Sequence, residues 1–142
     1  MTDVQFYNTC QPLEDALQYT CRLIEKVSAR RLPILVHTAD EAIGKQLDDL
    51  LWSFQETSFI GHTTDNSDYQ AINISWEDDP GEHHHVLINL GTQVPSWHGR
   101  FEKVLEIIYD QKDVIESKRN SFRYYKERGY PLRYHDLKKH PI

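Results

Sequence analysis

The stretch Pro-Ile-Leu-Val-His-Thr-Ala-Asp-Glu, residues 33–41, decides the fold class of this chain. The unbroken apolar run Ile34-Leu35-Val36 is typical of a strand buried on both faces, as in a parallel sheet. Thr38, followed three residues later by Glu41, matches the capping box that begins a helix. A buried strand that leads directly into a helix predicts an α/β sheet with right-handed crossovers.

The segments on both sides of this stretch extend the pattern to β-α-β-α. Upstream, residues 4–7 predict a short strand, and Gln11-Pro12 predicts the start of a helix. Apolar residues then recur at helical spacing: Leu13, Leu17, Cys21, Ile24 and Val27. Downstream, Ile43, Leu47, Leu50 and Leu51 form the apolar face of the helix that begins near Thr38.

The second half of the chain predicts further strands and one helix. Residues 61–69 are a predicted loop, while residues 72–76 and 86–90 alternate in polarity as half-buried strands do. These two strands either pair as a hairpin or lie apart in a mixed sheet. An apolar element follows at 101–109, and then a helix over about 113–128, which Gly129 and Pro131 end.

Together these elements predict a single-domain α/β three-layer sandwich with a mostly parallel central sheet flanked by helices. We expect one domain over residues 1–134 and a basic tail over 135–142. The positions of the six glycines do not allow either glycine-rich phosphate-binding motif to be written. The predicted architecture is therefore Rossmann-like but without a nucleotide-binding loop, and we expect no cofactor.

The charge of the chain is divided between its two parts. Residues 112–142 hold nine basic and four acidic residues, a net charge of +5, whereas residues 1–111 carry −11. An acidic protein with one basic, aromatic-rich end is suited to binding an anionic partner at that end.

The sequence also indicates the cellular compartment of the protein. Cys10 and Cys21 fit a reducing compartment, although a disulfide between them is compatible with the sequence. We find no apolar run of membrane-spanning length and no signal peptide. We therefore expect a cytoplasmic protein with no membrane partner.

The histidine run His83-His84-His85 is the most obvious candidate for catalysis. Consecutive side chains of a strand point to opposite faces, so at most His83 and His85 share one. A transition metal needs three or four converging ligands, and no further ligand stands at an evident spacing. A metal-dependent hydrolase built on His83–His85 is thus the less favoured alternative, and we expect neither a metal site nor catalytic residues.

An aromatic-rich segment follows the second predicted helix. It contains Leu51, Trp52, Phe54, Phe59 and Ile60. Tryptophan and phenylalanine in a connection, where polar residues are usual, are typical anchors of a protein interface. The same residues are equally compatible with a core cluster beneath a loop.

The C-terminal helix carries basic and aromatic residues on one face. Arg119, Phe122, Arg123 and Lys126 recur at helical spacing, and Ile115 extends the face with an apolar position. Such a face can bind single-stranded DNA through phosphate contacts and base stacking. It can equally bind an acidic peptide with an apolar end. The strongly acidic remainder of the chain favours the short peptide.

The sequence resembles the chi subunit family of bacterial DNA polymerase III over nearly its whole length. The matching segments are Val4–Tyr7 (VQFY), Leu47–Trp52 (LDDLLW), Ser58–His62 (SFIGH) and the helix end Tyr125…Gly129-Tyr-Pro-Leu132. Their order, their spacing and the total length agree with the family.

This resemblance implies a non-catalytic adaptor in DNA replication. Members of the family pair with the psi subunit, which tethers them to the clamp loader, and bind the acidic C-terminal tail of single-stranded DNA-binding protein (SSB). Nucleic acid is then reached indirectly, through SSB. The resemblance places the psi interface at Leu51, Trp52, Phe54, Phe59 and Ile60. It places the SSB-tail site at Ile108, Ile115, Lys118, Arg119, Phe122 and Arg123.

One departure from the family pattern affects the charges of the tail site. The family has a lysine one helical turn before the arginine that matches Arg119, and Ile115 stands at this position here. Either Lys112 or Lys118 is then expected to replace the missing charge.

Overall fold

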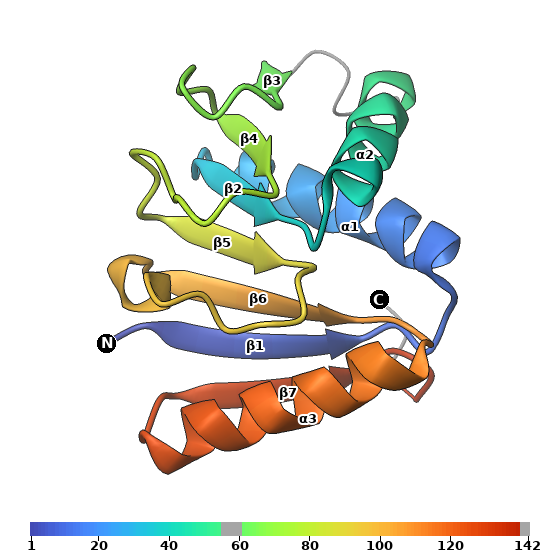
Figure 1. Cartoon of the computed structure of the whole chain (residues 1–142), viewed down its shortest axis with the longest axis vertical. Helices are drawn as coiled ribbons and strands as arrows, with labels where there is room; N and C mark the ends of the chain where they lie inside the picture. Colours follow the sequence, from blue (N-terminus) through green and yellow to red (C-terminus); the bar gives the residue numbers. More distant parts are fainter. Residues whose placement is uncertain (55–60, 140–142) are drawn as a thin grey trace.

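The computed structural model describes residues 1–54 and 61–139. Within these residues, the sheet has seven strands in the order β3-β4-β2-β5-β6-β1-β7, and every pairing is parallel (Figure 1). The strands are β1 (Asp3–Asn8), β2 (Ile34–His37), β3 (His62–Thr63), β4 (Ile72–Ser75), β5 (Val86–Asn89), β6 (Lys103–Ile108) and β7 (Leu132–Asp136). The helices are α1 (Leu13–Ala29), α2 (Glu41–Ser53), the short 3-10 helix η1 (His98–Arg100) and α3 (Lys112–Glu127).

The predicted three-layer α/β sandwich is confirmed. Helices α1 and α2 cover one face of the sheet and α3 covers the other (Figure 1). The apolar stripe of α1 packs with Leu47 and Leu51 of α2 against one side of β2, β4 and β5. On the opposite face, Tyr125 of α3 packs against Phe6 and Val104. Both faces of the central strands are therefore buried, as the apolar run at 34–36 predicts.

The strands β4 and β5 do not form a hairpin. Both pair with β2, one on each side, with Ile34 opposite Ile72 in one ladder and opposite Val86 in the other. Of the two arrangements that the alternating pattern allowed, the strands therefore lie apart, and the sheet is wholly parallel over the described residues.

The start of α2 differs from the predicted capping box. The N-cap is Asp40, whose Oδ1 accepts a hydrogen bond from the Ile43 amide at 2.9 Å. Thr38 is buried instead, and its hydroxyl donates to the Asp40 carbonyl. The prediction of Thr38 as the cap was wrong because aspartate caps a helix as well as threonine does, and it stands two residues closer to the first turn.

The end of α3 follows the sequence prediction, but the strand after it does not. Gly129 has a φ of +75°, and the Tyr130 amide donates to the Tyr125 carbonyl, which closes a Schellman motif. The chain then forms β7 alongside β1, a strand that the sequence analysis did not foresee. This strand runs through Asp136, so the expected domain boundary at residue 134 falls inside it.

Candidate functional site

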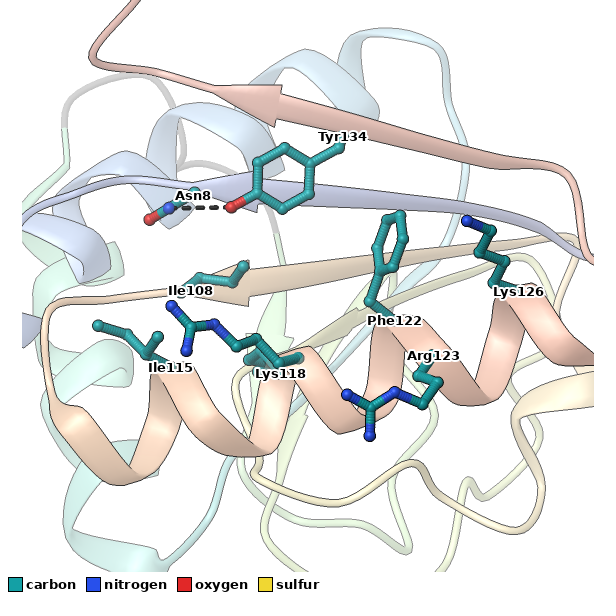
Figure 2. Close-up of a pocket in the computed structure, with 9 residues that line it drawn as sticks. Asn8, Ile108, Ile115, Lys118, Phe122, Arg123, Lys126 and Tyr134 are labelled. Atoms are coloured by element: carbon teal, nitrogen blue, oxygen red, sulfur yellow. Dashed lines mark hydrogen bonds between the residues drawn. The ribbon is translucent and has the colours of Figure 1, made fainter.

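A pocket of about 490 Å³ lies between α3 and the strands β1, β6 and β7 (Figure 2). Asn8 and Ile108, which line one end of it, are the last residues of β1 and β6. The chain leaves β1 for one face of the sheet and leaves β6 for the other. Neighbouring strands whose helices diverge in this way form the crevice in which open α/β sheets bind ligands.

The interior of the pocket is apolar and aromatic. Figure 2 shows Phe122 pointing from α3 toward β7, with Ile108 and Ile115 farther along the pocket. The Phe122 ring meets Tyr134 edge-on at 6.0 Å between centroids and meets the buried Phe6 at 5.3 Å. Tyr134 is held in turn by the amide of Asn8, which donates to its hydroxyl at 3.0 Å (Figure 2). An incoming apolar side chain would therefore meet packed aromatic edges.

The rim of the pocket is positively charged. Arg119, Arg123 and Lys126 are exposed on α3 and line the pocket, and no aspartate or glutamate among residues 1–54 and 61–139 lines it. The combination of an apolar interior with an unopposed cationic rim suits a ligand that is apolar at one end and anionic beside it.

Lys118 lines the same pocket but does not add its charge to the rim. Its ammonium is fully buried, 2.7 Å from Glu106 Oε1 and 3.0 Å from the Asn89 carbonyl oxygen. The Tyr125 hydroxyl donates to the other Glu106 oxygen, and burial together with this carboxylate raises the pKa of Tyr125. Since a buried ion pair is neutral as a whole, Lys118 anchors α3 to β6 and only its stem faces the pocket.

All six residues predicted for this site line one pocket, and three further residues join them. The six are Ile108, Ile115, Lys118, Arg119, Phe122 and Arg123, and the additions are Asn8, Lys126 and Tyr134. The sequence already placed Lys126 on the same helix face as Arg119 and Arg123, although it was not among the six residues predicted for the site. Asn8 and Tyr134 line the pocket because β1 pairs with β7, and the sequence did not predict this pairing. Lys112 does not line the pocket.

The histidine run does not converge on one point. His83 is buried, with Nε2 2.9 Å from Asn73 Oδ1 and its ring 4.7 Å from that of Tyr69. His84 is exposed, and its ring lies 4.1 Å from that of His85. Among residues 1–54 and 61–139, no three histidine, cysteine or acidic side chains gather as metal ligands would. The run is therefore divided between the interior, where His83 packs, and the surface, where His84 is exposed.

Comparison with known proteins decides the family. A family model described as DNA polymerase III chi subunit, HolC, matches residues 1–133. The DNA polymerase III subunit chi of Pseudomonas aeruginosa is 37% identical over 139 residues, which cover 96% of this chain and 98% of that protein. The chain belongs to the DNA polymerase III chi subunit family. Its role is thus that of a subunit of the replicative polymerase in DNA replication.

The surface at which the chi family resemblance placed the psi interface is only partly described. Trp52, at the end of α2, is 54% exposed, and its ring lies 4.0 Å from that of His62. His62 Nε2 lies in turn 3.5 Å from Asp48 Oδ1. Phe59 and Ile60 lie outside the described residues.

Two other residues predicted for that surface of the chi family member pack inward. Leu51 is fully buried in the core between α2 and the sheet, and Phe54 is half-buried against the same core. Leu51 belongs to the apolar stripe of α2, as its helical spacing predicts, while Trp52 lies one residue farther around the helix. No helix in the described part of the chain is long and apolar enough to cross a membrane.

Proposed function

We propose that this chi subunit is a non-catalytic adaptor that joins the acidic C-terminal tail of SSB to the clamp loader through the psi subunit. The tail enters the pocket between α3 and β7, and psi docks on the surface around Trp52. Through this adaptor contact, DNA is reached indirectly, by way of SSB, in the cytoplasm. The observation that carries the proposal is the union of an apolar pocket with Arg119, Arg123 and Lys126 at its rim.

The apolar and the charged residues of the pocket have different roles in this proposal. Phe122, Ile115 and Ile108 surround the terminal aromatic side chain of the tail, and its burial supplies most of the affinity. The exposed charges of the rim contribute less than about 1 kcal/mol each and mainly steer the acidic tail toward the pocket. A site for one short peptide predicts micromolar affinity, on the order of −8 kcal/mol, that weakens as salt rises.

The cation that replaces the family lysine at Ile115 is Lys126 in this proposal. Lys118 is engaged with Glu106, and Lys112 lies outside the pocket lining. Lys126 lies on the rim next to Phe122 in the pocket lining (Figure 2). The positive charge of the family lysine is therefore replaced at a position farther along α3, and the acidic residues of the tail lie toward β7.

The test is calorimetric titration with a nine-residue peptide that carries an SSB-type acidic C-terminus, beside the same peptide without its last phenylalanine. We expect micromolar binding that disappears with the phenylalanine. Phe122→Ala should weaken binding at least tenfold, whereas Arg119→Ala and Lys126→Ala should each weaken it about threefold. Lys112→Ala is the matched control, because it removes an exposed cation of the same helix that lies outside the pocket. This variant should bind the peptide with the affinity of the wild type.

The psi surface is tested with one further variant, Trp52→Ala, beside Arg119→Ala. Trp52→Ala should weaken binding of purified psi and leave the peptide affinity unchanged, whereas Arg119→Ala should do the opposite. If the Arg119 and Phe122 variants bind the peptide like the wild type, the tail site is elsewhere. If Trp52→Ala binds psi normally, psi docks on another surface.

A further inference from the structure

A second pocket lies on the opposite face of the sheet from the α3 pocket. It has a volume of about 370 Å³ and lies beside the C-terminal half of α1. Tyr7, Leu23, Val86 and Leu105 form its buried lining. Along β1 and β6, Tyr7 and Leu105 alternate with residues that face α3, so the two pockets are separated by the whole sheet.

Four cationic side chains line this second pocket. They are Lys26 and Arg30 from α1 with its C-cap, Lys103 at the start of β6, and Arg133 on β7. Three of them belong to the strongly acidic part of the chain, residues 1–111, which has only seven basic residues in all. A gathering of cations is thus unexpected in this part of the molecule.

These cations have little opposing charge. Asp3 is the only carboxylate in the described part of the chain that lines the pocket, and Gln5 Nε2 donates to it at 3.4 Å. Over residues 1–54 and 61–139, none of the four cations forms an ion pair within 4.0 Å. Like charges held together without counter-charges repel one another, and an anion in the pocket would relieve that repulsion.

The dipole of α1 explains only part of the arrangement. Lys26 and Arg30 lie at the carboxyl end of this helix, where cations interact favourably with the dipole. Lys103 and Arg133 come from strands, and no helix end accounts for them. Arg30 and Arg133 are nevertheless close enough to Tyr7 to oppose the rise that burial causes in its pKa. Cations from α1, β6 and β7 therefore line one pocket.

We propose that this pocket binds the phosphodiester backbone of a single-stranded nucleic acid. Arginine forks and lysine ammonium groups are the usual partners of phosphate oxygens. The apolar lining of Leu23, Val86 and Leu105 accommodates an unpaired base, which a duplex would keep stacked inside. The proposal is independent of the SSB-tail site, because no residue that the structure describes lines both pockets.

The first measurement is fluorescence anisotropy of a labelled oligothymidylate at low salt. Four phosphate contacts predict that the logarithm of the association constant falls with the logarithm of salt concentration with a slope of about −3. The double variant Arg30→Glu/Arg133→Glu should bind at least tenfold more weakly. The control, Arg22→Glu/Lys112→Glu, makes the same change in net charge at exposed positions outside both pockets and should lose less than threefold.

A second measurement locates the binding surface. In NMR titrations the oligonucleotide should shift amides of β1 and the end of α1, and an SSB-type peptide should shift those of α3. The proposal is overturned if the oligonucleotide does not bind, or if Arg123→Glu/Lys126→Glu abolishes its binding while the Arg30/Arg133 variant does not. It is also overturned if the acidic peptide, and not the oligonucleotide, shifts β1 and α1.

Discussion

Lys118 and Arg119 are neighbours on the same helix and yet perform different tasks. The ammonium of Lys118 is enclosed by Glu106 and the Asn89 carbonyl beneath the pocket, while Arg119 is exposed at the rim. A buried pair costs desolvation energy that its attraction only partly returns, so its value lies in fixing the position of α3. One residue thus holds the helix, and the next meets the ligand.

The pair can be tested with a double-mutant cycle in urea denaturation. Lys118→Met leaves the Glu106 carboxylate buried without its cation, and we expect a loss of about 3–5 kcal/mol in the free energy of unfolding. Glu106→Gln should cost a similar amount. The double variant removes both charges and should be at least about 1.5 kcal/mol more stable than the sum of the single losses predicts. Additive losses would contradict a direct pair.

A second residue-scale prediction concerns pH. Burial, with His85 and His84 nearby, lowers the pKa of His83 to about 4, below the ordinary value of 6.5. The neutral form is therefore favoured in the folded state, and its stabilisation is complete above pH 6.5 and is lost as the pH falls toward 4.

The effect of His83 can be isolated by substitution. Between pH 7 and pH 5 the free energy of unfolding should fall by about 2 kcal/mol more in the wild type than in His83→Gln. Denaturation curves of both proteins at the two pH values measure the difference. Equal losses in the two proteins would show that His83 titrates normally.

At the scale of elements, the close approach of α2 to Trp76 determines how this helix sits on the sheet. Gly44 lies in the middle of α2, and a Cβ atom there would come within 2.5 Å of Trp76 Cε3 and 3.2 Å of Thr38 Oγ1. Glycine is unfavourable inside a helix, so its presence here reflects packing and not helix propensity.

Gly44→Ala should therefore destabilise the protein by about 1–2 kcal/mol, since the overpacking cost exceeds the gain in helix propensity. Gly99→Ala is the control, because the nearest atom to its Cβ lies 3.9 Å away, and it should change stability by less than about 0.5 kcal/mol. Urea denaturation measures both. A stabilised Gly44→Ala protein would mean that Trp76 moves aside freely.

At the scale of the whole molecule, local pattern predicts the layers but not the order of the strands. The run at 34–36 and the stripe of α1 specify a buried parallel sheet, because period and polarity are local properties. The separation of β4 from β5 by β2 is a long-range choice that neither strand encodes by itself. Strand β7 went unnoticed because its charged outward residues obscure the alternation of Leu132 and Tyr134 with Arg133 and His135.

The candidate site could likewise be predicted only where it depends on a single element. Helical spacing brought Arg119, Phe122 and Arg123 onto one face correctly, since that face depends on α3 alone. It could not show that the Lys118 ammonium turns inward, because the carboxylate that receives it lies on another element. The wall formed by Asn8 and Tyr134 likewise required knowing that the two ends of the chain meet.

The position of β1 between β6 and β7 has a consequence for biosynthesis. Strand β1 finds its two neighbours only after residues 103–136 have been made, so a nascent chain that ends before them cannot complete the sheet. The pocket, whose walls come from β1, α3 and β7, forms only after β7 has been made. A nascent chain that ends before β7 therefore cannot compete with the folded subunit for a ligand of this pocket.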